Sequence, residues 1–235
     1  SSDLKSSEGI SGFANSAIWL IVGAFLFSRG FIKTGLGKRI AYNLISAFGS
    51  SSLRLAYALA LSDLILAPAT PSNTARVGGV IMPITTSLAK AFGSEPQDGP
   101  RKIGSFLMQS IYQVNTITSA MFQTSMAGNT LVAALALQSF GIGITWGDWA
   151  MAAIVPGIIA LIIMPYFIYK VYPPEIKDAR EAQQMIREEL KGLGKISFQE
   201  WVMLGVFILA LVLWATSQFT KLDATTVAFL GISIL

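Results

Sequence analysis

The chain of 235 residues contains no cysteine and no histidine. Without cysteine, a disulfide framework and a thiolate metal site are both excluded. Without histidine, the chain lacks the side chain that most often serves as general base, proton relay or metal ligand. Charged residues are also scarce, at 13% of the sequence, against about 25% in an ordinary soluble domain. These shortages exclude a soluble globular enzyme, and no catalytic residue is predicted.

The sequence has long uncharged runs instead. Four runs carry no charge: Gly9–Ser28, Ile103–Gly147, Trp149–Tyr169 and Trp201–Thr220. A fifth run, Leu55–Lys90, is uncharged up to its last residue except for Asp63 and Arg76. A run of about 18 apolar residues predicts a transmembrane helix. We therefore expect an all-α, polytopic helical membrane protein. The net charge of +4 does not indicate a nucleic-acid partner, because the basic residues lie in short loops between the runs.

The loop charges predict the orientation of the chain. Four basic residues and no acidic residue lie between positions 29 and 39, which marks the cytoplasmic side. Gly35 and Gly37 predict a turn in the middle of this segment. The segment 170–200 contains six lysines or arginines, whereas the loop 139–148 contains none. A full crossing by residues 53–91 would place the segment 170–200 outside. The charge pattern therefore favours a segment 53–91 that enters and leaves on the cytoplasmic side.

The segment Leu53–Ala91 is too short for two spans of about 20 residues each and too broken for one. Two prolines and a Ser-Asn pair interrupt its middle. A re-entrant helical hairpin with its turn at Ala67–Ser72 fits this pattern, since non-helical backbone at membrane depth must be covered by protein or water. Gly78 and Gly79 are expected to let another helix approach closely.

The run 103–138 is long for one span and unusually polar. Nine polar side chains fall within residues 112–125, and Gly128-Asn129 predicts a break before a helix resumes over Thr130–Leu137. We expect a discontinuous helix whose polar face lines a cavity. The alternative is a buried helix whose polar groups bond to neighbouring helices.

These elements predict five segments. Residues 1–52 form the first spanning helix and a cytoplasmic amphipathic segment on the scaffold side, and 53–138 form the hairpin and broken helix on the transport-site side. Residues 139–169 form a spanning helix, 170–200 a charged cytoplasmic connector, and 201–235 a spanning helix and the start of the next. Because the last apolar run is too short to span, we expect an internal piece of a longer membrane protein.

The connector is expected to contain a surface helix over Glu175–Leu190, following Pro173 and Pro174. A solvated connector is the simpler interpretation of its charges. A helix that binds the membrane surface or a partner is the alternative.

The most informative stretch is Pro71–Gly79, at the expected hairpin tip. A half-helix beginning near Asn73 would direct its N-terminus at the membrane midplane, where free N–H groups and the helix dipole favour an anion. Ser72, Asn73 and Thr74 add donors that orient a carboxylate and oxygens that hold a small cation. The alternative is that these residues only cap the helix.

Arg76 lies four residues beyond Ser72 in an apolar arm, where a charge costs on the order of 3 kcal/mol or more. Such residues usually serve a site; a snorkelling Arg76, or a structural pair with Asp63, is the alternative. A substrate with two carboxylates needs compensating positive charge, which sodium ions or a fixed arginine can supply. A fixed charge cannot leave with the substrate, so Arg76 favours exchange over sodium-coupled symport.

The stretch Leu66–Ile84 (LAPATPSNTARVGGVIMPI) resembles the Ser-Asn-Thr hairpin of the divalent-anion/sodium symporter family. More narrowly it is similar to the exchanger branch, with bacterial citrate/succinate and tartrate/succinate antiporters and the chloroplast 2-oxoglutarate/malate translocator. The similarity extends to Ser11–Ala41 and Arg101–Ser110. It implies an elevator-type homodimer with two inverted repeats, of which this chain is the N-terminal part. Its implied function is the exchange of di- and tricarboxylates such as 2-oxoglutarate, malate, succinate and citrate.

The resemblance places the first motif on Ser72, Asn73 and Thr74 and the facing loop on Ser125–Thr130. The candidate substrate-binding residues are Ser72, Asn73, Thr74, Arg76, Ser125, Asn129 and Thr130. No cofactor or resident metal is expected; in a sodium symporter, sodium would bind at Ser72, Asn73 and Gly128. The expected partners are the carboxylate, the lipid bilayer and a second copy of the chain, with no nucleic acid.

The expected location is the plasma or bacterial inner membrane, as a multi-pass protein, with the chloroplast inner envelope as the alternative. Two other classes remain open, a membrane scaffold and an intramembrane enzyme that would use Ser72 with Asp63. The enzyme is disfavoured because the chain has no histidine to activate a nucleophile.

Overall fold

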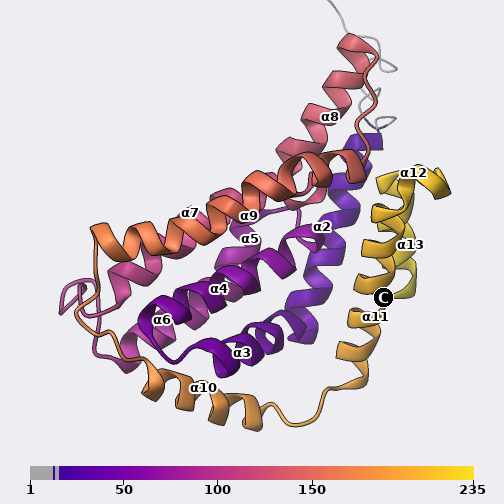
Figure 1. The fold of residues 1–235 in the computed structure, drawn as a ribbon. Helices are drawn as coiled ribbons and strands as arrows, with labels where there is room; N and C mark the ends of the chain where they lie inside the picture. Colours follow the sequence, from indigo (N-terminus) through magenta and orange to yellow (C-terminus); the bar gives the residue numbers. More distant parts are fainter. Residues whose placement is uncertain (1–12, 14–15) are drawn as a thin grey trace, which may run out of the picture.

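The computed structural model describes Phe13 and residues 16–235, and the regular structure it describes is helical apart from one isolated bridge between Ser51 and Asp178. The start of the first predicted span lies outside the described residues. The helices of the two ends of the chain are α2 (Ser16–Thr34), α3 (Leu36–Phe48), α11 (Phe198–Ala215), α12 (Ser217–Thr220) and α13 (Ala224–Ile234). Figure 1 shows α2 beside α11 and α13 at one side of the molecule.

The first helix bends where the sequence predicts a turn. Gly35 has φ +78°, a left-handed conformation that glycine adopts without steric cost. The chain changes direction by 61° there, between α2 and α3. The predicted turn is therefore confirmed at Gly35, whereas Gly37 lies inside α3.

The charged connector forms α10 (Arg180–Gly192), a few residues later than predicted. Its apolar residues Ala182 and Ile186 are buried, and Gln183 Nε2 donates to Ser46 O of α3 at 2.8 Å. The partner of this helix face is thus another helix of the same chain, along which α10 runs in Figure 1.

Before α10, a side-chain hydrogen bond from Arg180 lowers the pKa of Asp178 to about 2. This carboxylate and its arginine partner are both exposed. The pair therefore remains charged at neutral pH on the surface of the connector.

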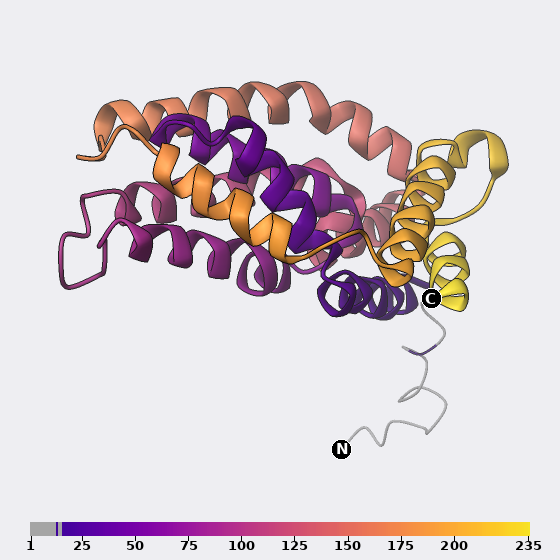
Figure 2. The same cartoon turned by 90° about the horizontal axis from the view of Figure 1, so that it is seen from below.

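Residues 52–91 run out and back. The outgoing arm is α4 (Ser52–Leu66) with the 3₁₀ turn η2 (Ala67–Ala69), and the returning arm comprises α5 (Asn73–Arg76), the π-helical turn η3 (Val77–Ile81) and α6 (Met82–Ala91). Figures 1 and 2 show the start of α4 and the end of α6 at the same end of the molecule.

Backbone hydrogen bonds join the loops at that end. Ser52 N donates to Lys177 O at 3.0 Å, and Ile176 N donates to Lys102 O at 2.9 Å. The connector segment before α10 thereby links the beginning of the outgoing arm to the loop that follows the returning arm.

The polar run forms two helices, α7 (Gly104–Met121) and α8 (Ala127–Phe140), separated by the 3₁₀ turn η4 (Gln123–Ser125). The predicted break at Gly128-Asn129 is misplaced by a few residues, since both residues lie in the first turn of α8. The physical reason is that side chains after α7 satisfy the backbone earlier: Ser125 Oγ accepts from Phe122 N, and Asn129 Nδ2 donates to Phe122 O.

Among the described residues, three helical stretches are long and apolar enough to cross a membrane, and the bent pair α2–α3 is a fourth if it counts as one span. The three stretches are Ser52–Ala69, α9 (Trp146–Val171) and Phe198–Ala215. Two predicted spans are thus confirmed as long apolar helices. α7 packs against both α4 and α9, so the broken helix lies between the hairpin and a long apolar helix.

Candidate substrate site at the hairpin tip

The hairpin tip and the break between α7 and α8 are in direct contact. Ala127 N, at the start of α8, donates to Pro71 O at 2.9 Å. Thr124 Oγ1 donates to Pro68 O at 2.6 Å and accepts from Trp146 Nε1 at 3.0 Å. The structure therefore brings together two helix N-termini, those of α5 and α8, which come from segments some fifty residues apart.

The Ser-Asn-Thr motif caps the returning arm and still retains donors. Ser72 Oγ accepts from Ala75 N at 3.2 Å, and Asn73 Oδ1 accepts from Thr74 N at 2.9 Å. The capping role considered from the sequence is thus confirmed. The Ser72 hydroxyl hydrogen and the Asn73 amide donors have no partner among the described residues, and Thr74 is exposed. These donors are free for a ligand at the helix N-terminus.

The side chains of the facing loop donate their hydrogens to nearby backbone carbonyls and not to the hairpin tip. Ser125 Oγ donates to Phe122 O at 2.7 Å, Asn129 Nδ2 donates to Ser119 O and Phe122 O at 2.7 and 2.9 Å, and Thr130 Oγ1 donates to Gln123 O at 3.2 Å. All three residues are buried. They give the break its shape and position the start of α8, where the Gly128 N–H has no partner among the described residues.

Arg76 is 1% exposed, and all five of its N–H donors are used. Nε donates to Asp63 Oδ1 at 2.8 Å. Nη1 donates to the carbonyls of Thr70 and Ser125 at 3.1 and 3.3 Å, and Nη2 donates to the hydroxyls of Thr118 and Ser119, both at 3.2 Å. Arg76 therefore joins both arms of the hairpin to the broken helix.

This geometry confirms the Asp63–Arg76 pair that the sequence left as the alternative. In this conformation Arg76 has no free donor for a substrate, and the carboxylate beside it cancels its charge. Its direct contact with a carboxylate substrate stays a prediction.

Several residues of the tip network escaped the sequence reasoning. Thr118 and Ser119 were visible only as members of a polar run, although they are the hydroxyls that bind Arg76.

Gly78 and Gly79 were both expected to let another helix approach closely. Gly79 does approach α2, since a Cβ there would lie 3.2 Å from Ile32 Cδ1. A Cβ on Gly78 would meet nothing within 4 Å, so the predicted close approach is wrong for Gly78 in this structure.

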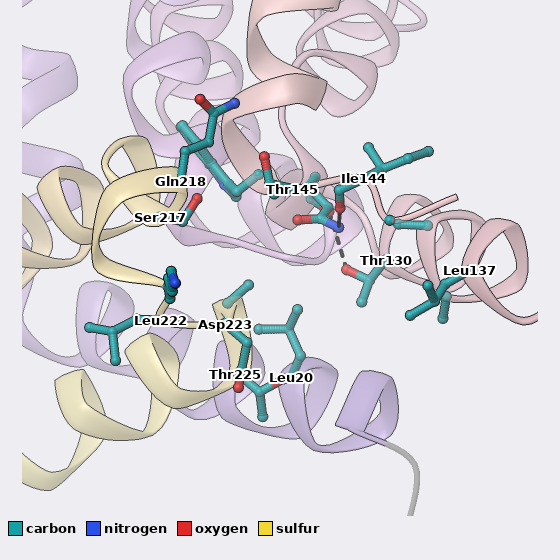
Figure 3. A pocket seen from close by; sticks show the side chains of 17 residues that line it. Leu20, Thr130, Leu137, Ile144, Thr145, Ser217, Gln218, Leu222, Asp223 and Thr225 are labelled. Carbon is teal, nitrogen blue, oxygen red and sulfur yellow. Dashed lines mark hydrogen bonds between the residues drawn. The ribbon is translucent and has the colours of Figure 1, made fainter. Parts of the chain in front are cut away.

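A cavity of about 510 Å³ adjoins the broken helix. Figure 3 shows Thr130 and Ile144 on one side of it and Ser217 and Leu222 on the other. The Ser217 hydroxyl is buried and has no hydrogen-bond partner within the described part of the chain. The cavity is thus lined by Gln123 of the break and Thr130 of α8.

No cluster of three or more acidic side chains that could hold a metal ion occurs in the part of the chain that the structure describes. A sodium ion near the tip would have to be held by hydroxyl, amide and carbonyl oxygens, the ligands that Ser72, Asn73 and Gly128 offer.

Long apolar helices around a buried polar break, with helix N-termini meeting inside, are the architecture of a helical membrane transporter. A family model for the transmembrane region of sodium:sulfate symporters matches residues 2–235, and the chain belongs to this family. This is a family of membrane transporters and not of enzymes.

The chain is similar to several curated transporters. It is 53% identical to a putative malate transporter, YflS, of Bacillus subtilis, over 99% of this chain and 49% of the relative. It is 46% identical to dicarboxylate transporter 1 of spinach chloroplasts, over 99% and 41%, and 38% identical to the citrate/succinate antiporter of Escherichia coli, over 97% and 47%. The resemblance to the exchanger branch is thus confirmed. The chain spans about half the length of these relatives.

Proposed function

We propose that the protein is a secondary carrier that exchanges di- and tricarboxylates such as 2-oxoglutarate, malate, succinate and citrate. The observation that carries this proposal is the meeting of two helix N-termini with unpaired donors, the Ser72 hydroxyl and the Asn73 amide on one and the Gly128 N–H on the other. Such an arrangement favours a carboxylate through the helix dipoles and the free donors. The names of the malate, dicarboxylate and citrate/succinate relatives support this substrate class.

The same proposal includes a re-entrant hairpin over Leu53–Ala91. Its support is the placement of the start of α4 and the loop after α6 at one end of the molecule, joined through residues 175–179. A homodimer of the elevator type with two inverted repeats is part of the proposal and rests on the family resemblance. In that architecture a second hairpin would complete the site.

A second candidate, sodium-coupled symport, is favoured by one observation. Asp63 lies 2.8 Å from Arg76, so the pair contributes no net positive charge to a dianion. The compensating charge must then come from elsewhere in the complete carrier or from sodium ions. The family name includes sodium symport, whereas the citrate/succinate relative is named an antiporter.

Counterflow in proteoliposomes separates the two candidates. The full-length protein is reconstituted, and uptake of labelled succinate is measured with and without internal succinate, in sodium and in potassium medium. Exchange predicts uptake only into loaded vesicles and no effect of the cation. Sodium-dependent uptake into vesicles without internal dicarboxylate would instead establish symport, and no uptake of any tested carboxylate would overturn the substrate class.

A further inference from the structure

Asp63 is the acidic residue at the centre of the tip network. It is 2% exposed, and its Oδ1 accepts from Arg76 Nε at 2.8 Å. Its Oδ2 accepts from the Thr118 hydroxyl and from Asn115 Nδ2, the latter at 3.3 Å. The carboxylate of the outgoing arm is thus bonded both to the returning arm and to α7.

These bonds determine which way the Arg76 guanidinium faces. Asp63 accepts a hydrogen bond from Nε, and the hydroxyl oxygens of Thr118 and Ser119 accept from Nη2. Nη1 is left to face the carbonyls of Thr70 and Ser125, one in the hairpin turn and one in the break before α8. Asp63 therefore positions the group that holds the two facing loops together.

The same contact fixes the charge at the tip. An isolated guanidinium in a buried site is a unit positive charge, but an ion pair at 2.8 Å is neutral overall. The interior around the pair screens charge far less than water does. A change in the net charge of the pair is therefore felt by an anion bound at the adjacent helix N-termini.

We propose that Asp63 is a positioning and specificity-determining residue of the carboxylate site, which orients Arg76 and cancels its charge so that the site does not favour the more highly charged carboxylate. This inference rests on the proposed carboxylate transport. With Asp63 present, the pair does not favour a trianion over a dianion. Without Asp63, Arg76 adds one positive charge and favours the substrate with more negative charge.

The expected size of the effect follows from Coulomb's law. We take a separation of about 10 Å between the Asp63–Arg76 pair and the bound substrate, and an effective dielectric constant of about 20. One unit of charge added to the pair then changes the affinity by about tenfold for each extra charge on the substrate. Asp63→Asn keeps the side-chain size and Arg76→Gln shortens the side chain but keeps an amide donor; the two variants change the net charge of the pair by one unit in opposite directions. The double variant restores neutrality with an amide pair.

The test uses the full-length carrier in proteoliposomes at pH 8, where citrate carries one more negative charge than succinate. Competition of each acid against labelled malate gives a ratio of inhibition constants for wild type, both single variants and the double variant. We expect Asp63→Asn to shift the ratio about tenfold towards citrate and Arg76→Gln to shift it towards succinate. The double variant should return close to the wild-type ratio.

Each outcome separates this inference from the transport proposal. Wild-type competition by both acids tests the substrate class by itself, before any variant is compared. An unchanged ratio in a folded single variant would overturn the role of Asp63. Recovery of only the double variant in folded form would show that the pair is structural, and would also overturn it. If one single variant does not fold, the other tests the same inference through a shift of the inhibition-constant ratio in the opposite direction.

Discussion

At the scale of single residues, the tip separates side chains that build the site from side chains that remain free to bind. Ser125, Asn129 and Thr130 donate their side-chain hydrogens to backbone carbonyls of the break and of the last turn of α7. Ser72 accepts a capping bond through its oxygen, which leaves the hydroxyl hydrogen to donate. The Ser-Asn-Thr motif therefore offers the donors, while the facing loop supplies the shape and a backbone N–H.

Ser72→Ala should weaken dicarboxylate binding beyond its effect on folding. A hydrogen bond to a charged group is worth about 1.5–3 kcal/mol, which corresponds to roughly tenfold or more in affinity. Loss of the cap costs about 1 kcal/mol of stability. Isothermal titration with succinate and thermal unfolding of the purified full-length variant measure the two effects.

The matched control is Ser197→Ala. Ser197 caps α11 with the same geometry, accepting from Glu200 N at 3.2 Å. This variant should lose similar stability and keep wild-type affinity. Equal affinities in both variants would reduce Ser72 to a helix cap.

At the scale of helices, the break between α7 and α8 is held against α9 by close packing. A Cβ on Gly157 of α9 would lie 2.6 Å from Met121 Cγ and 2.7 Å from Met121 Sδ, at the last residue of α7. Glycine at this position lets the end of α7 approach α9. The packing therefore positions the beginning of the break.

Gly157→Ala should lower the melting temperature and the transport rate, because the added methyl group displaces Met121 at the start of the break; overpacking costs about 1–3 kcal/mol. Gly205→Ala in α11 is the control, since a Cβ there meets nothing within 4 Å. Helix propensity makes that variant neutral or more stable. Differential scanning fluorimetry and uptake assays compare the two; a Gly157→Ala protein as stable as Gly205→Ala would contradict the packing account.

The helices show which features a sequence can predict. Prolines at 68 and 71 restrict the backbone, and the glycine at 35 permits a left-handed conformation, so the hairpin turn and the α2–α3 bend follow from the chain itself. The end of α7 depends on side-chain bonds made by Ser125 and Asn129 across several residues, so its position was missed. The partners of Arg76 on α7 lie more than forty residues away, and only the packed helices reveal them.

At the scale of the whole molecule, the segment before α10 meets both open ends of the hairpin at one end of the molecule (Figure 1), whereas Arg39 of the basic segment 29–39 bonds to Gly194 and Glu200. The segment 175–179 bonds to residues 50–52 and 101–102 there. From that end, α4 runs to the hairpin tip and α7 runs to the break, and the tip and the break are in contact. This arrangement is what a re-entrant hairpin with cytoplasmic open ends requires.

Single cysteines test that topology cleanly, because the chain has none of its own. Gln97→Cys and Glu188→Cys, both at exposed positions, should react with an impermeant maleimide from the cytoplasmic side. Ser139→Cys, exposed near the end of α8, should react from the opposite side. Labelling of both Gln97→Cys and Glu188→Cys from the side opposite the cytoplasm, which a full crossing by residues 53–91 requires, would contradict the re-entrant hairpin.

Substrate protection at the hairpin tip measures whether a carboxylate binds there. In the full-length carrier, Thr74→Cys places a thiol at an exposed position of the tip, and Ser139→Cys serves as the distant control. Saturating succinate should slow maleimide labelling of Thr74→Cys several-fold and leave Ser139→Cys unchanged. Equal labelling rates of Thr74→Cys with and without succinate, in a variant that still transports succinate, would contradict carboxylate binding at the tip.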